Sequence, residues 1–199
     1  MMEQNILTNV WNYFLSLEKD LDDTSRYIEP RGQENVHSFE FAKILVLSYT
    51  ELESVFKILC VEIENRKCGT IKQYKEILLN SYPNIVHAEV NISRWNNTIC
   101  PFKGWDKGPL PWWSAYVNVK HNRQNNFNDA TYKNTIYALS ALYVSIMYLS
   151  KITGHPIRDF ESNYIESNYT SALITTLPIK MLPDFDTNFH TTRQISSEI

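Results

Sequence analysis

The sequence has little glycine and lacks the glycine-rich motifs of several common enzyme folds. Only 5 of its 199 residues are glycine, and all-β architectures with many tight turns need more of it. No glycine-rich phosphate-binding loop occurs, and no serine stands in the nucleophile-elbow pattern of hydrolases. These absences argue against nucleotide-binding α/β folds and α/β-hydrolases.

Cysteine and histidine are also sparse. The three cysteines, Cys60, Cys68 and Cys100, form no CxxC pair, and no secretory signal pattern stands at the first residues. We therefore expect a reducing, cytoplasmic setting. The five histidines are scattered, and none has another four residues away. Because metal sites need clustered ligands, we expect neither a metal nor another cofactor.

The sequence lacks an excess of basic residues. Its 19 Lys and Arg against 22 Asp and Glu give a net charge of −3, so any contact with nucleic acid must come from a local basic patch. Long apolar runs are missing too. The uncharged stretch 134–150 is shorter than the roughly 20 residues that span a bilayer. We expect a buried core helix there, and no membrane partner.

What the sequence does contain is helical periodicity. Apolar residues recur at helical spacing in five segments, and capping or helix-breaking residues flank several of them. The expected helices are 4–26, 37–65, 70–80, 111–123 and 129–152. The sequence therefore predicts an all-α fold, a helical bundle of about five helices over residues 1–153. The second helix is the most apolar along its length, which suggests that it is central.

Two other segments have a different pattern. Residues 86–103 alternate between polar and apolar residues around an Asn-Asn turn, which predicts a small hairpin or extended excursion. Residues 154–199 show no sustained period, so we expect an irregular, partly extended tail that docks on the bundle. Asn128 or Asp129 is the expected cap of the last long helix, and Gly154 its end.

The stretch WWSAYVNVKHNRQNNF, residues 112–127, is the strongest candidate for a site. Lys120, His121 and Arg123 gather where this helix is expected to end. One explanation is structural, because cations at a helix C-terminus are stabilised by the macrodipole by about 0.3 to 1 kcal/mol. The other is chemical. Histidine transfers protons near neutral pH, and arginine can hold a phosphate through two hydrogen bonds.

Other residues could support that chemistry. Tyr116 and Asn118 lie on the same helix and could position a substrate, and Glu51 on the second helix could be a carboxylate partner of the cations. Trp112 and Trp113 could stack on bases, although aromatic residues at this spacing more often belong to the core.

The second helix with ELESVFKIL, and a later helix that ends in VKHNR before an amide-rich break, resemble the HEPN superfamily over residues 37–152. HEPN domains are small all-helical proteins, often dimeric, found in prokaryotic toxin–antitoxin and phage-defence systems. Many are metal-independent RNases. The resemblance implies that His121 is the catalytic histidine and that the substrate is RNA.

The chain departs from the family's catalytic pattern, in which an arginine precedes the histidine by four to six residues. The nearest arginine upstream of His121 is Arg94, and Arg123 follows the histidine instead. Lys120 and Arg123 are therefore our candidates for the missing cation. The literal spacing occurs once, from Arg31 to His37, in a segment expected to be a linker.

The sequence thus leads to two hypotheses. In the first, a cytoplasmic homodimer acts on RNA within a toxin–antitoxin or defence system, with an antitoxin or defence protein as partner. His121, Arg123 and Lys120 would be catalytic, and Tyr116, Asn118, Glu51 and His37 would position the substrate. In the second, the chain is a non-catalytic interaction module that binds a partner protein or a nucleotide. We expect the dimer because the last long helix is rich in aromatic residues and poor in charge.

Overall fold

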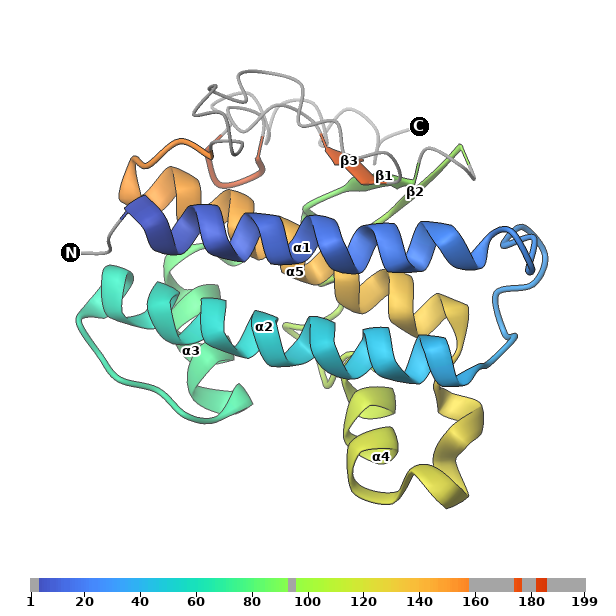
Figure 1. Ribbon diagram of the computed structural model, residues 1–199. Coiled ribbons are helices and arrows are strands. Elements are labelled where there is room, and N and C mark those ends of the chain that lie inside the picture. The colour runs from blue at the N-terminus through green and yellow to red at the C-terminus, as the bar shows by residue number, and fades with distance from the viewer. Residues whose placement is uncertain (1–3, 93–95, 158–173, 177–181, 186–199) are drawn as a thin grey trace, which may run out of the picture.

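The computed structural model describes residues 4–92, 96–157, 174–176 and 182–185. Its helices and strands, in chain order, are α1 (Gln4–Thr24), α2 (Phe39–Glu64), α3 (Ile71–Ser81), η1 (Pro83–His87), β1 (Val90–Ile92), β2 (Asn97–Ile99), α4 (Pro111–Asn126), η3 (Phe127–Asp129), α5 (Tyr132–Thr153) and β3 (Ile174–Thr176). The five α-helices confirm the predicted all-α bundle (Figure 1).

The most deeply buried helix is α5. Every residue from 138 to 150 is buried, and α1, α2 and α4 pack around the helix. Small residues of α5, such as Ala138 and Ser145, are fully buried, and small side chains let neighbouring helices approach closely. Within the described residues, α5 is the one helix long and apolar enough to cross a bilayer, and 83% of its most apolar window is buried inside the protein.

This burial removes the argument for a homodimer that the sequence suggested. The aromatic, uncharged surface of α5 is covered by helices of the same chain. A second copy is therefore not needed to shield it, and that reason was wrong. The homodimer itself stays a prediction.

The second helix, α2, packs against all four other α-helices. Its start is fixed by Ser38, whose hydroxyl accepts a hydrogen bond from the Phe41 backbone N–H at 3.0 Å. Its end is marked by Asn65 in the left-handed region, with φ of 51°, a conformation that asparagine tolerates better than most residues. The predicted helix over 37–65 is confirmed to within a residue or two at each end.

A three-stranded antiparallel sheet lies on one side of the bundle, in the order β2-β1-β3 (Figure 1). β1 and β2 form the predicted hairpin, with Val90 opposite Ile99. β3 comes from the C-terminal region and pairs with the other edge of β1, with Val90 opposite Thr176. The other residues of the predicted tail, 158–173, 177–181 and 186–199, lie outside the described residues.

A second piece of the C-terminal region, residues 182–185, also docks on the bundle. Leu182 is buried. One carboxylate oxygen of Asp184 accepts a hydrogen bond from the Asn84 backbone N–H at 2.9 Å, and the other accepts one from the Tyr148 hydroxyl at 2.8 Å. We call residues 182–185 the C-terminal latch.

The start of α5 differs from the prediction. Thr131 is the N-cap, and its hydroxyl accepts a hydrogen bond from the Asn134 backbone N–H at 3.1 Å. Neither Asn128 nor Asp129 caps α5, because both belong to the short helix η3. The carboxylate of Asp129 instead accepts a hydrogen bond from the side chain of Asn118 at 2.7 Å.

Candidate functional site

The end of α4 is built by asparagine side chains. The backbone of Asn122 leaves the helical region, with φ of −150° and ψ of 67°. Its side-chain oxygen accepts a hydrogen bond from the Asn125 N–H at 3.4 Å, and the Asn126 amide donates to the Asn122 carbonyl at 3.0 Å. The predicted amide-rich break is therefore a kink followed by one more helical turn, in which Asn122 acts as an N-cap.

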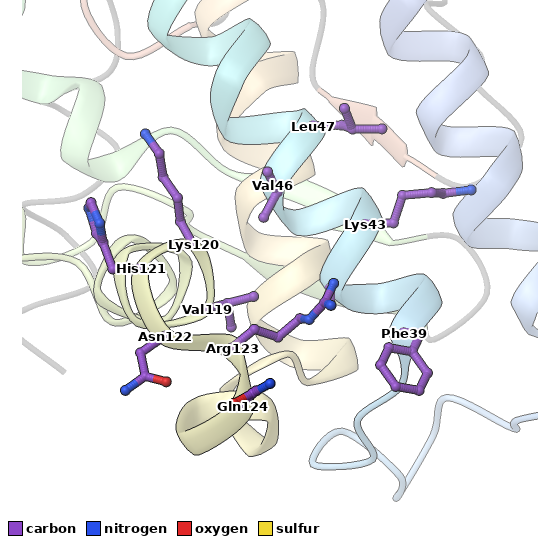
Figure 2. Close-up of a pocket in the computed structure, with 11 residues that line it drawn as sticks. Phe39, Lys43, Val46, Leu47, Val119, Lys120, His121, Asn122, Arg123 and Gln124 are labelled. Atoms are coloured by element: carbon purple, nitrogen blue, oxygen red, sulfur yellow. The ribbon is translucent and has the colours of Figure 1, made fainter.

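A groove of about 720 Å³ lies between the first half of α2 and the end of α4 (Figure 2). Its lining comprises Phe39, Ala42, Lys43, Val46, Leu47, Val119, Lys120, His121, Asn122, Arg123 and Gln124. All the charged side chains among these lining residues are basic, whereas the whole chain has a net charge of −3. The groove is thus a local basic patch with an apolar floor.

Lys120 is held at the groove by the protein core. Tyr116 is buried and stacks on Tyr49 of α2, with ring centroids 3.8 Å apart. The Lys120 ammonium lies over the Tyr116 ring, 5.4 Å from its centroid. Hydrogen bonding to the Tyr116 side chain is the main cause that raises the pKa of Lys120, and the negative charge of Glu53 adds to it. Lys120 therefore stays cationic.

Lys43 and Arg123 differ in how far they are already paired. Lys43 extends toward α1 (Figure 2), where it forms ion pairs with Asp20 at 3.2 Å and with Glu40. Arg123 is exposed, and its guanidinium lies 5.8 Å from the centre of the Phe39 ring. Arg123 makes no ion pair within the described part of the chain. It is the cation that is most available to a ligand.

His121 and Arg123 lie on opposite sides of the α4 end. In Figure 2, Arg123 reaches toward α2 and Phe39, whereas His121 points away from them. The helical spacing of Trp113, Val117 and His121 predicts that His121 lies on or beside the apolar stripe of the helix, but the residue is exposed. Trp112 and Tyr116, in the first half of α4, are buried, whereas the end of the helix is exposed. His121 and Arg123 both line the groove, but their side chains point in different directions.

The carboxylate whose charge acts on Lys120 is that of Glu53, not of Glu51. Glu53 pairs with Lys57 of the same helix at 3.2 Å and accepts a hydrogen bond from the Tyr74 hydroxyl at 3.3 Å. Glu51 is half-buried, and burial alone raises the pKa of its carboxyl, with no cation contributing. Two residues along a helix correspond to a rotation of about 200°, so the two glutamates lie on different sides of α2.

His37 reaches the edge of the site through Phe127. Its backbone forms an isolated bridge with Thr131, and its ring meets the Phe127 ring edge-on at 5.2 Å. Phe127 in turn packs against Phe39, with ring centroids 4.7 Å apart. His37 is not among the residues that line the groove. The segment that carries it is nevertheless fixed beside the end of α4.

Two further candidates have structural partners. The side-chain amide of Asn118 donates a hydrogen bond to the Asp129 carboxylate. The backbone carbonyl of Asn118 accepts a hydrogen bond from the Asn126 side chain at 3.4 Å. Asn118 therefore fastens the last turn of α4 to the chain that follows. Trp112 is buried, and its indole N–H donates to the Pro101 carbonyl at 2.7 Å. The expectation that Trp112 belongs to the core is confirmed.

Comparison of the chain with protein-family models, curated proteins and solved structures finds no match in any of the three. The described residues also contain no group of three or more His, Cys, Asp or Glu side chains that could hold a metal ion. The site is thus defined by its own geometry: an exposed histidine, a free arginine and a fixed lysine around an apolar groove.

Proposed function

We propose that the chain is a HEPN-like protein that acts on RNA, and that the groove between α2 and α4 receives the phosphate backbone. The observation that supports this is the inversion of charge at the groove. The chain is acidic overall, yet every charged lining residue is basic. Arg123 and Lys120 reach the groove, and both are exposed. Clustered cations of this kind bind nucleic acid through its phosphates.

In this proposal, Arg123 and Lys120 bind phosphate oxygens and His121 transfers protons. The 2′-hydroxyl attacks the adjacent phosphorus and loses its proton. The bond from phosphorus to the 5′-oxygen breaks, and that oxygen gains a proton. The products are a 2′,3′-cyclic phosphate and a free 5′-hydroxyl. Tyr116 and Asn118 are positioning residues, because Tyr116 holds Lys120 and Asn118 holds the end of α4.

The opposite placement of His121 and Arg123 supports a homodimer in the proposal. A phosphate that contacts both residues is reached more readily if the histidine comes from one copy and the arginine from the other. In a two-fold dimer, such a composite site would occur twice. We place this dimer in the cytoplasm, in a toxin–antitoxin or phage-defence system with a protein partner.

The experiment is RNA cleavage by the purified protein in the presence of a metal chelator. The wild type would be compared with His121→Ala and Arg123→Ala, and the product ends examined for cyclic phosphate. Lys72→Ala, which removes an exposed lysine of α3 away from the groove, is the control. We expect cleavage by the wild type and the control, and a loss of at least a hundred-fold in the two site variants.

A non-catalytic interaction module is the alternative, and the apolar floor of the groove favours it. Absence of cleavage, or cleavage that is indifferent to both substitutions, would contradict the RNase proposal. The groove would then be tested for binding of a partner protein or a nucleotide.

A further inference from the structure

Three aromatic rings pack against one another in series beside the groove, which the first of them, Phe39, also lines. They belong to Phe39, Phe127 and His37, and we call them the aromatic platform. Phe39 and Phe127 are 4.7 Å apart between ring centroids, and Phe127 and His37 are 5.2 Å apart. The platform joins three segments of the chain: the linker before α2, the first residue of α2 and the short helix η3.

Phe39 is unusually exposed for a phenylalanine, at 71%. It is the first residue of α2, whereas the buried face of α2 begins at Phe41 and Ala42. Burying such a side chain stabilises a fold, and this fold leaves most of the Phe39 side chain in contact with solvent. Phe127 supports one side of the ring, and the ring also lines the groove. The exposed part of Phe39 thus offers an apolar surface for a flat ligand.

The charge around the platform narrows the choice of ligand. The Arg123 guanidinium lies 5.8 Å from the Phe39 ring centre, and no acidic side chain lines the adjoining groove. A fitting ligand therefore combines flat rings with closely spaced negative charges. Single-stranded nucleic acid has both, and its bases stack on aromatic side chains while its phosphates pair with arginine and lysine. In a duplex the base faces are already stacked and cannot reach such a platform.

Building on the proposed function, we propose that the aromatic platform is a base-stacking subsite and that the substrate is single-stranded RNA. An unpaired base stacks on Phe39, while the neighbouring phosphate lies against Arg123 in the groove. This restricts the substrate from RNA in general to RNA with an accessible base beside the bound phosphate.

The test is a binding titration with a short fluorescent 2′-O-methyl RNA strand, whose blocked 2′-oxygen prevents cleavage. The same strand with abasic positions and the corresponding duplex are the two comparison ligands. We expect Phe39→Leu to weaken binding of the intact strand about ten-fold, since a stacked base contributes about 1 to 3 kcal/mol. Binding of the abasic strand should not change, and Phe39→Tyr should bind the intact strand like wild type.

Salt dependence separates the stacking contact from the phosphate contact. Arg123→Ala should weaken binding of the intact and abasic strands alike and reduce the slope of log K against log salt by about one. Phe39→Leu should leave that slope unchanged. Tyr27→Leu, which removes an aromatic residue that is 88% exposed elsewhere on the surface, is the matched control and should have no effect.

The outcomes distinguish this inference from the proposed function. If Arg123→Ala weakens binding but Phe39→Leu does not, the stacking subsite is refuted, RNA binding stands and the platform becomes a candidate protein contact. If Phe39→Leu weakens binding of the intact and abasic strands equally, the stacking subsite is also refuted. If the wild type binds none of the three ligands, both proposals fail.

Discussion

Tyr116 links the core of the protein to the groove, although its own side chain is buried. Its ring stacks on Tyr49 and its hydroxyl holds the ammonium of Lys120. A lysine side chain is long and flexible, so an isolated surface lysine loses much rotamer freedom when it binds a ligand. Here the buried tyrosine restricts the lysine in advance.

The substitution Tyr116→Phe tests this arrangement because it removes only the hydroxyl and keeps the stacked ring. We expect RNA affinity to fall about two- to five-fold, since one hydrogen bond of about 0.5 to 1.5 kcal/mol is lost. In a Lys120→Ala background, the same substitution should have no further effect on affinity. Titrations of the four proteins would measure this, and an additive loss in the double variant would contradict it.

At the scale of elements, α2, α3 and α5 each begin at a residue whose side chain caps the helix. Thr131 carries this role for α5, the helix that forms most of the core. Thr131→Ala should lower the free energy of unfolding by about 1 kcal/mol, because the Asn134 N–H loses its acceptor. Thr131→Ser keeps the hydroxyl and should recover most of the loss. Urea denaturation followed by circular dichroism would measure both, and equal losses in the two variants would rule out the cap.

The helices could be predicted from the sequence, whereas the details of the site could not. Apolar periodicity located all five α-helices because each buries one face against the others. The sequence predicted the amide-rich break but not its form, a kink at Asn122 followed by a further turn, because side-chain amides compete locally with the helical backbone. Because the kink falls between Lys120 and Arg123, helical spacing alone does not fix how these two side chains are placed relative to each other.

The other differences come from tertiary packing. The charge of Glu53, and not that of Glu51, acts on Lys120 because of the way α2 packs against its neighbours. The periodicity of α2 alone does not say which neighbour each face will meet. The exposure of Phe39 is likewise set by tertiary packing, since a phenylalanine beside a helical apolar stripe is expected to be buried.

At the scale of the whole molecule, the proposed homodimer makes a quantitative prediction. His121→Ala and Arg123→Ala should each be inactive alone, but a mixture that exchanges subunits should regain activity. Half of the dimers would be mixed, and each mixed dimer would hold one intact composite site of two. About a quarter of wild-type cleavage is therefore expected. No recovery after exchange, or a monomer by light scattering at micromolar concentration, would refute the composite site.

Several buried tyrosines determine how the fold responds to alkali. Burial raises the pKa of Tyr49 to about 12 and is the main cause of the raised pKa values of Tyr74 and Tyr148. In the unfolded chain these hydroxyls ionise near pH 10. The folded state therefore binds more protons above that pH, and its stability falls as the pH rises from about 10 to 12.

These tyrosines should leave the urea midpoint of unfolding nearly constant between pH 8 and about 9.5. Above pH 10 the midpoint should drop steeply. The tyrosinate absorbance of the buried group should appear together with loss of helical circular dichroism. Ionisation of all twelve tyrosines in the intact helical state would contradict the burial that we describe.

The C-terminal latch has a consequence for the order of events in folding. Asn84 and Asp184 are 100 residues apart in sequence, yet their contact helps to hold the latch on the bundle. Closing so long a loop is costly in entropy until the helices are in place. Latch contacts should therefore form after the transition state. Tyr148→Phe, which removes one of these contacts, should speed unfolding several-fold and leave the refolding rate nearly unchanged in stopped-flow experiments. The latch would then give the folded bundle kinetic stability, because it slows unfolding without changing the rate of folding.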